Sequence, residues 1–234
     1  MAAGSATALI VAAGSGQRLG AGGPKALIEV AGRPMYEWSV DACASATAVG
    51  RTIVAVPAGH EDGFSAAGIE LVEGGATRSH SVEAGLLMVD TDYVVVHDAA
   101  RPLVTPSLID DVVAMLDADP DLDAVIAAAP VTDTVKRVNA DGVVDATLDR
   151  EELRSVQTPQ VFRTAALRRA MAAGDIQNAT DDAFLIESAG GRVGVLDTLA
   201  SNIKVTVASD IDLAEYLLAR QEAMKNPSPQ ESPT

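Results

Sequence analysis

A glycine-rich segment follows the first apolar run of the chain and carries two cationic side chains. Residues 11–30 read VAAGSGQRLGAGGPKALIEV, and Arg18 and Lys25 are the only cations in this stretch. Backbone N–H groups in such a loop can converge on phosphate oxygens, and the two cations can neutralise the charge of a triphosphate. The N–H groups concerned belong to Gly14, Ser15 and Gly16. The segment therefore indicates a nucleoside triphosphate site.

The same loop supports two other interpretations. GSGQRLG has the spacing G-x-G-x-x-x-G, one residue longer than the dinucleotide fingerprint of NAD-binding Rossmann folds. That fingerprint also needs an acidic residue at the end of the second strand, and the expected second strand ends AVPAGH, without one. The Walker A pattern GxxxxGKS or GxxxxGKT is absent too. A glycine-rich turn without a ligand is the third interpretation, and the loop alone leaves all three open.

An acidic residue follows an apolar strand further along the chain. The segment VVVHDAARP places Asp98 at the end of that strand and Arg101 just beyond it. Ligands of open parallel sheets bind outside the carboxyl ends of the strands, so Asp98 is placed to hold Mg²⁺ or its water. Alternatively, Asp98 only caps the next turn. We expect His97 to be a hydrogen-bonded structural residue rather than a base.

Five further polar clusters are weak evidence individually. They are TDTVK (132–136), LDR (148–150), QTPQ (157–160), TDD (180–182) and NIKVT (202–206). Thr180 or Asp181 could serve only as a helix cap. Lys204 lies in an apolar setting, so it is either at the edge of a sheet or a buried cation that faces an anion.

These clusters lie between apolar runs of strand length and segments of helix length that alternate along the chain. The expected strands are Thr7–Val11, Arg51–Pro57, Ile69–Glu73, Tyr93–His97, Ala124–Ala129, Ser155–Gln157 and Arg192–Leu196. The expected helices are Pro34–Ala46, Thr77–Met88, Thr105–Asp117, Thr164–Ala173 and Ser209–Ala223. The alternation predicts a single α/β domain, residues 1–225, whose mostly parallel sheet has helices on both faces.

One segment interrupts the alternation, and the chain ends in a polar tail. Residues 131–150 contain short Val-rich runs around Asp141-Gly142, which is a hairpin turn signal. An isolated hairpin is marginal in water, so this arm packs either on its own domain or on a neighbouring subunit. We favour the neighbouring subunit. Residues 226–234, NPSPQESPT, are predicted to be disordered.

The composition excludes several classes of partner. The 234 residues carry a formal net charge of −16, which argues against binding to nucleic acid or to an anionic membrane surface. No apolar run reaches membrane-spanning length, and the N-terminus lacks the basic region of a signal peptide. Cys43 is the only cysteine, so no intrachain disulfide can form, which fits a cytoplasmic protein.

Taken together, the motifs resemble one enzyme family. In order they are AAGSGQRLG…PK, GGATRSHSV, HDAARP, DTVK, DR, TPQ, TDD and NIKVT. Over about residues 6–222 this set resembles the 2-C-methyl-D-erythritol 4-phosphate cytidylyltransferases of the non-mevalonate isoprenoid pathway. HDAARP together with NIKVT distinguishes this group from other sugar nucleotidyltransferases. The resemblance implies a Rossmann-like nucleotidyltransferase sheet and transfer of CMP from CTP to the acceptor, with Mg²⁺ and release of pyrophosphate.

The resemblance also implies roles for individual residues. The catalytic set is Arg18, Lys25 and Lys204. The nucleotide-binding set is Ala12, Ala13, Gly14, Ser15, Gly16, Gly74, Gly75, Arg78 and Ser81. The acceptor-binding set is Asp98, Arg101, Thr134, Arg150, Thr158 and Thr180, with Asp98 also at the metal. In the family the arm crosses to the other subunit, which implies a homodimer.

The chain departs from the family pattern at Val11, Ala26 and Ala76, of which Ala76 bears on contacts to the base. Three alternative functions stay open. The nearest is a cytidylyltransferase for another polyol phosphate such as ribitol 5-phosphate. The others are an NAD-dependent oxidoreductase and a nucleotide-binding regulator without catalytic activity.

Overall fold

The computed structural model describes residues 2–14, 16 and 22–225, and it is built around one seven-stranded sheet. The strand order is β11-β7-β10-β6-β1-β4-β5. Only β10 runs antiparallel to its two neighbours, β6 and β7. The bounds are β1 Ala6–Val11, β4 Val49–Val56, β5 Ile69–Glu73, β6 Tyr93–Asp98, β7 Ala124–Pro130, β10 Arg154–Arg163 and β11 Val193–Asp197. The predicted α/β class and mostly parallel sheet are confirmed.

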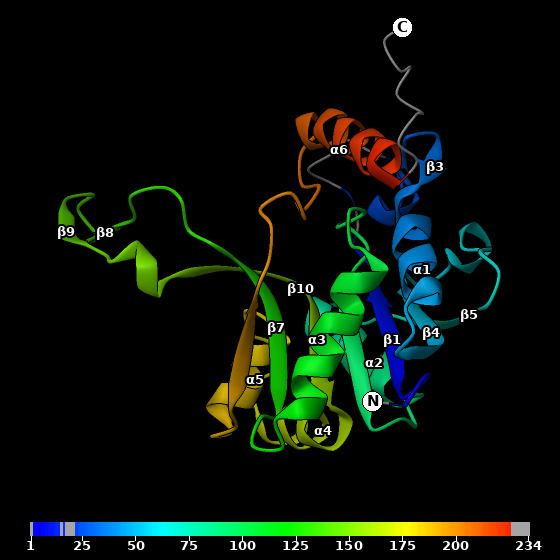
Figure 1. Cartoon of the computed structure of the whole chain (residues 1–234), viewed down its shortest axis with the longest axis horizontal. Coiled ribbons are helices and arrows are strands. Elements are labelled where there is room, and N and C mark those ends of the chain that lie inside the picture. Colours follow the sequence, from blue (N-terminus) through cyan, green and yellow to red (C-terminus); the bar gives the residue numbers. More distant parts are fainter. Residues whose placement is uncertain (1, 15, 17–21, 226–234) are drawn as a thin grey trace, which may run out of the picture.

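Helices cover both faces of the sheet (Figure 1). They are α1 Met35–Ser45, α2 Arg78–Leu86, α3 Pro106–Ala118, α4 Thr164–Ala173, α5 Asp182–Ser188 and α6 Ser209–Lys225. Successive side chains of β1 point to opposite faces, so Ile10 belongs to the core that includes side chains of α1 and α3, while Leu9 belongs to the core that includes side chains of α2, α4 and α5. Burial on both sides explains why the central strands are continuous apolar runs.

Two elements differ from the sequence-based expectation. Strand β10 extends to Arg163, well beyond the predicted end at Gln157. Its pairing with β7 shifts register between Val156 and Gln160, and this irregularity accommodates Pro159 within a strand. Helix α5 was not predicted, because its seven residues are too few to show a helical period in the sequence.

The predicted arm is a two-stranded hairpin of β8, Lys136–Val138, and β9, Val144–Thr147. Figure 1 shows it reaching away from the sheet. The ion pair Arg137–Asp145, at 2.7 Å, links its two strands. The side chains of Val138, Val143 and Val144 are exposed.

Short elements complete the described chain. They are β2 Glu29–Val30, β3 Arg33–Pro34 and the 3₁₀ turns η2 Lys25–Leu27, η3 Glu61–Gly63 and η4 Arg150–Glu152. Among the described residues, no helix is both long enough and apolar enough to cross a membrane. The tail predicted to be disordered, residues 226–234, lies outside the described residues.

Candidate active site

A cavity of about 720 Å³ opens at the carboxyl ends of β1 and β6. These two strands are paired in parallel, with Val11 opposite Asp98, so the segments that follow them leave the sheet side by side. The lining includes Ala12, Ala13, Gly14, Gly16, Lys25, Gly75, Ala76, Arg78, Ser81, Asp98, Lys204 and Thr206. The fold thus brings the glycine-rich loop, GGATRSHSV, HDAARP and NIKVT to one cavity.

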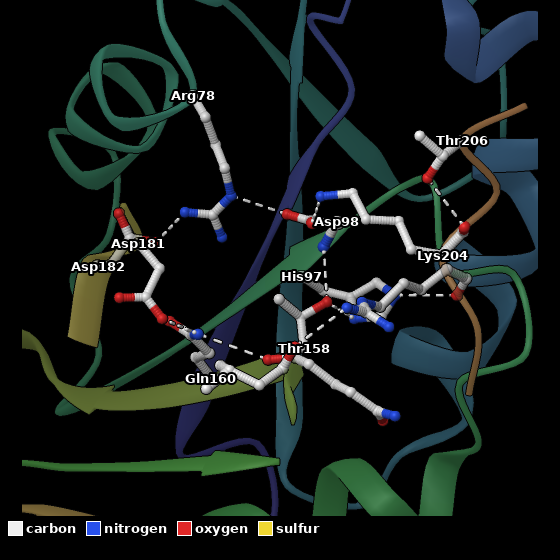
Figure 2. Close-up of polar contacts among 12 residues, drawn as sticks. Arg78, His97, Asp98, Thr158, Gln160, Asp181, Asp182, Lys204 and Thr206 are labelled. Atoms are coloured by element: carbon white, nitrogen blue, oxygen red, sulfur yellow. Dashed lines mark hydrogen bonds and ion pairs between the residues drawn. The ribbon is translucent and has the colours of Figure 1, made fainter. Parts of the chain in front are cut away.

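Asp98 lines this cavity and contacts two cations (Figure 2). Its Oδ1 accepts a hydrogen bond from Arg78 Nε at 2.8 Å, and its Oδ2 accepts one from Lys204 Nζ at 2.6 Å. Burial alone raises the pKa of Asp98, but Arg78 and Lys204 outweigh it and hold that pKa well below its usual range. Asp98 is therefore ionised at neutral pH, and Lys204 is the cation that faces an anion.

Arg78 also binds a second carboxylate, which the sequence analysis missed. It begins α2, and its Nη1 donates to Asp182 Oδ2 at 2.5 Å. Asp182 begins α5 and is fully buried, and burial raises its pKa above the ordinary value. The neighbouring Asp181 is the cap of α5, because its Oδ1 accepts from Phe184 N.

The glycines of the cavity allow close packing of its loops. A Cβ atom on Gly74 would lie 2.6 Å from the Cβ of Ala13, so a side chain there would separate the loop after β1 from the loop after β5. Gly75 N donates to Ser81 Oγ at 3.1 Å, which fixes the first turn of α2 against this loop. Gly16 has a φ of +69°, which favours glycine.

Comparison with known proteins matches these features to one family. The family model described as 2-C-methyl-D-erythritol 4-phosphate cytidylyltransferase matches residues 6–220. The chain belongs to this family. The Nocardia farcinica cytidylyltransferase of this name is 47% identical, with 94% of this chain and 97% of that protein covered. The crystal structure of the Thermus thermophilus cytidylyltransferase superposes with a TM-score of 0.78 at 35% identity, and covers 94% of this chain and 100% of that one.

Membership of this cytidylyltransferase family confirms the predicted family and the predicted activity class, a nucleotidyltransferase. It favours the main hypothesis over an NAD-dependent oxidoreductase or a regulator without activity. Ser15 and Arg18 lie outside the described residues, so their roles stay predictions.

His97, a buried residue of β6, forms hydrogen bonds both to the segment after β6 and to β10. Its Nε2 lies 3.2 Å from Arg101 O, an oxygen that can only accept, so Nε2 carries the proton. Its Nδ1 then accepts from Thr158 Oγ1, which is 3.0 Å away. Thr158 Oγ1 in turn accepts from Asp98 N. Burial lowers the pKa of His97 to about 4, so it is neutral, as expected for a structural residue.

Arg101 holds the segment that carries Lys204. Its Nη1 donates to Asn202 O at 2.7 Å and its Nη2 donates to Val156 O at 3.3 Å. Asn202 Nδ2 donates to Thr158 O at 2.9 Å. Arg101 and Thr158 therefore position the walls of the site and do not line the cavity, so their contact with an acceptor stays a prediction.

Three further predicted acceptor residues also lie outside the lining of the cavity. Thr134 is exposed in the arm. Arg150 lies at the base of the arm, where its Nη1 donates to Thr132 O at 2.6 Å. Thr180 is exposed just before α5. Gly74 is also outside the lining and acts through the close packing described above.

Proposed function

We propose that this protein transfers CMP from CTP to 2-C-methyl-D-erythritol 4-phosphate and releases pyrophosphate. The product is 4-diphosphocytidyl-2-C-methyl-D-erythritol. The observation that supports this most directly is the concentration of Lys25, Arg78 and Lys204 around one cavity in a chain of net charge −16. Such a cluster in an acidic protein suits a ligand with several phosphates.

The acceptor phosphate is its own nucleophile. Its second pKa is about 6, so it is largely dianionic at neutral pH. One of its oxygens forms a bond to the α-phosphorus of CTP, while the bond from that phosphorus to the bridging oxygen of pyrophosphate breaks. No proton has to be removed, which agrees with a cavity lined by cations and by one carboxylate, Asp98, whose pKa is held too low for an effective general base.

Lys25 and Lys204 stabilise the charge that develops in this step. Both line the cavity, and Lys204 reaches it from the segment held by Arg101 and Asn202. Preorganised cations of this kind stabilise the transition state more than the ground state, because charge accumulates on the transferred phosphoryl group and the leaving pyrophosphate. The protein also holds the two anions in line, which lowers the entropic part of the barrier.

The donors of the cavity fit a magnesium ion bound together with the nucleotide. Mg²⁺ in phosphate-handling sites takes one or two carboxylates and completes its coordination with phosphates and water. Asp98 is one ionised carboxylate in the cavity, and the described residues contain no cluster of three or more metal-binding side chains that could hold a metal alone. When bound, Mg²⁺ neutralises charge on the phosphates.

The arm suits a role in a homodimer, in which Thr134 and Arg150 reach the site of the partner. Its exposed valines and its projection from the sheet support this proposal. A cytoplasmic location stays a prediction, supported by the single cysteine, Cys43.

Pyrophosphate release separates the candidate functions. The purified protein is mixed with CTP and Mg²⁺, and with 2-C-methyl-D-erythritol 4-phosphate, ribitol 5-phosphate or no acceptor. We expect release with the first acceptor only. Faster release with ribitol 5-phosphate would reassign the acceptor. CTP binding without pyrophosphate release in any of the three mixtures would indicate a regulator. Thermal stabilisation by NAD but not by CTP would indicate an oxidoreductase.

A further inference from the structure

Arg78 is shared between two carboxylates that come from different elements. Its Nε binds Asp98 Oδ1 at the end of β6, and its Nη1 binds Asp182 Oδ2 at the start of α5 (Figure 2). Lys204 contacts the other oxygen of Asp98, Oδ2, so each carboxylate oxygen of Asp98 binds one cation. A divalent cation that approaches Asp98 meets the repulsion of both side chains.

Each of the two cations has another place to bind when nucleotide and metal arrive. Lys204 lines the cavity, where the phosphates of the nucleotide would attract it. For Arg78, the alternative is Asp182. The Oδ1 atom of Asp182 is buried and has no hydrogen-bond donor among the described residues. A buried carboxylate oxygen without a donor costs free energy, so an additional N–H group would stabilise it.

The guanidinium group of Arg78 can supply that N–H group. An arginine binds a carboxylate end-on through Nη1 and Nη2, one N–H for each oxygen. Nη1 already contacts Asp182 Oδ2, so rotation of the guanidinium about this contact would bring Nη2 to Oδ1 and withdraw Nε from Asp98.

We propose that Asp182 is a positioning residue, which draws Arg78 away from Asp98 when the divalent cation binds with the nucleotide. Asp98 Oδ1 then becomes available to the metal, and the charge of Arg78 stays neutralised. Metal binding is thereby coupled to nucleotide binding, because the metal alone brings no anionic group that could bind Lys204 in place of Asp98. The inference rests on the proposed function only for the use of a metal–nucleotide complex, and not for the identity of the acceptor.

The experiment measures metal-dependent nucleotide binding without an acceptor. Mn²⁺ replaces Mg²⁺, and water-proton relaxation enhancement distinguishes Mn²⁺–CTP on the protein from Mn²⁺–CTP in solution. Calorimetry with EDTA gives the affinity for CTP alone. The readout is the ratio of the two dissociation constants, which reports the contribution of the metal.

Asp182→Asn removes the charge of one of the two carboxylates that bind Arg78, so that of the two only Asp98 stays charged. We expect the Kd for Mn²⁺–CTP to rise about tenfold, while the Kd for CTP alone changes less than about twofold. The double variant Arg78→Met, Asp182→Asn removes both charges and uncovers Asp98, so we expect the ratio of its Kd for CTP alone to its Kd for Mn²⁺–CTP to be at least as large as in the unmodified protein. Asp90→Asn, in an exposed arginine cluster at the other end of the sheet, is the matched control and should change neither constant.

Two results would overturn the proposal. One is an unchanged ratio of the two dissociation constants in Asp182→Asn, and the other is a double variant in which the ratio of the Kd for CTP alone to the Kd for Mn²⁺–CTP is smaller than in the unmodified protein. Circular dichroism and the Tm establish that each variant is folded. If Asp182→Asn does not fold, the double variant alone decides by the same criterion. A wrong acceptor would abolish pyrophosphate release and leave this pattern of binding constants intact, so the two failures are distinguishable.

Discussion

The two ends of the parallel sheet each carry an arginine that bridges two carboxylates. At the carboxyl ends, Arg78 joins Asp98 and Asp182, whose side chains are 10% and 0% exposed. At the amino ends, Arg51 joins Glu70 at 2.9 Å and Asp90 at 2.7 Å, and these carboxylates are 44% and 75% exposed. The chemical groups are alike, but solvent screens the second cluster and little reaches the first.

This difference shows what makes a charged cluster functional. The segments that follow β1 and β6 and the loop before α6 enclose the carboxyl ends, and within this cavity Arg78 and Lys204 keep Asp98 charged. The Arg51 cluster is at the surface and links β4, β5 and the segment before β6. The comparison predicts that substitutions at the first cluster alter catalysis and stability, whereas equivalent ones at the second alter neither strongly.

The largest expected effect is on catalysis. Lys204→Ala should reduce kcat for pyrophosphate release by about 10²–10³, because one preorganised cation is lost from the transition state. Arg51→Ala likewise removes a cation that is paired with carboxylates, but at the other end of the sheet, and it should leave kcat unchanged. Steady-state assays with CTP and the methylerythritol phosphate acceptor test both. Near-normal turnover in Lys204→Ala would contradict the role of Lys204.

The next effect is on stability. Arg78→Ala leaves the buried carboxylate of Asp182 without its partner and should lower the free energy of unfolding by about 3–5 kcal/mol. Arg51→Ala removes contacts that are exposed and screened, and should have a much smaller effect. Urea denaturation followed by circular dichroism measures the two values. Equal losses in the two variants would show that burial does not distinguish the clusters.

The smallest effect is a pH dependence that belongs to the carboxyl end. The pKa of His97 is lowered from 6.5 to about 4 in the folded protein, so below pH 6.5 the unfolded chain binds a proton that the folded chain does not. The contribution of His97 to stability should therefore fall by about 3 kcal/mol between pH 6.5 and pH 4 and level off below that range.

Two variants assign this pH dependence to one end of the sheet. His97→Gln should flatten the slope between pH 6.5 and pH 4, measured by urea denaturation at several pH values. Arg51 lowers the pKa of Glu70 from 4.5, so the contribution of that carboxylate is lost as the pH falls below that value. Glu70→Gln should therefore leave the slope between pH 6.5 and about pH 5 as it is, and a flattened slope there would contradict the assignment to His97.

Part of the site could be predicted from the sequence, because the residues concerned follow apolar strands or stand in cationic loops. Lys25, Asp98 and Lys204 are in this group, and the cavity contains all three. Asp182 could not be predicted in this way. Its partner Arg78 lies 104 positions earlier, and the local sequence TDD suggests only a helix cap, which Asp181 provides. Nothing in the sequence indicated that the N–H groups of Arg101 bind the carbonyls of Asn202 and Val156, and its contact with an acceptor stays a prediction.

By itself the sequence determined the alternation of strands and helices, the arm, the family and the cations available to a phosphate ligand. Periodicity, turn residues and composition are local properties, and they can be assessed without knowing which strands are neighbours. The tertiary structure decided which carboxylate each cation meets and which of these pairs is screened by solvent. Pairing between distant segments and their burial depend on strand order and helix packing, and these set the electrostatic strength of each cluster.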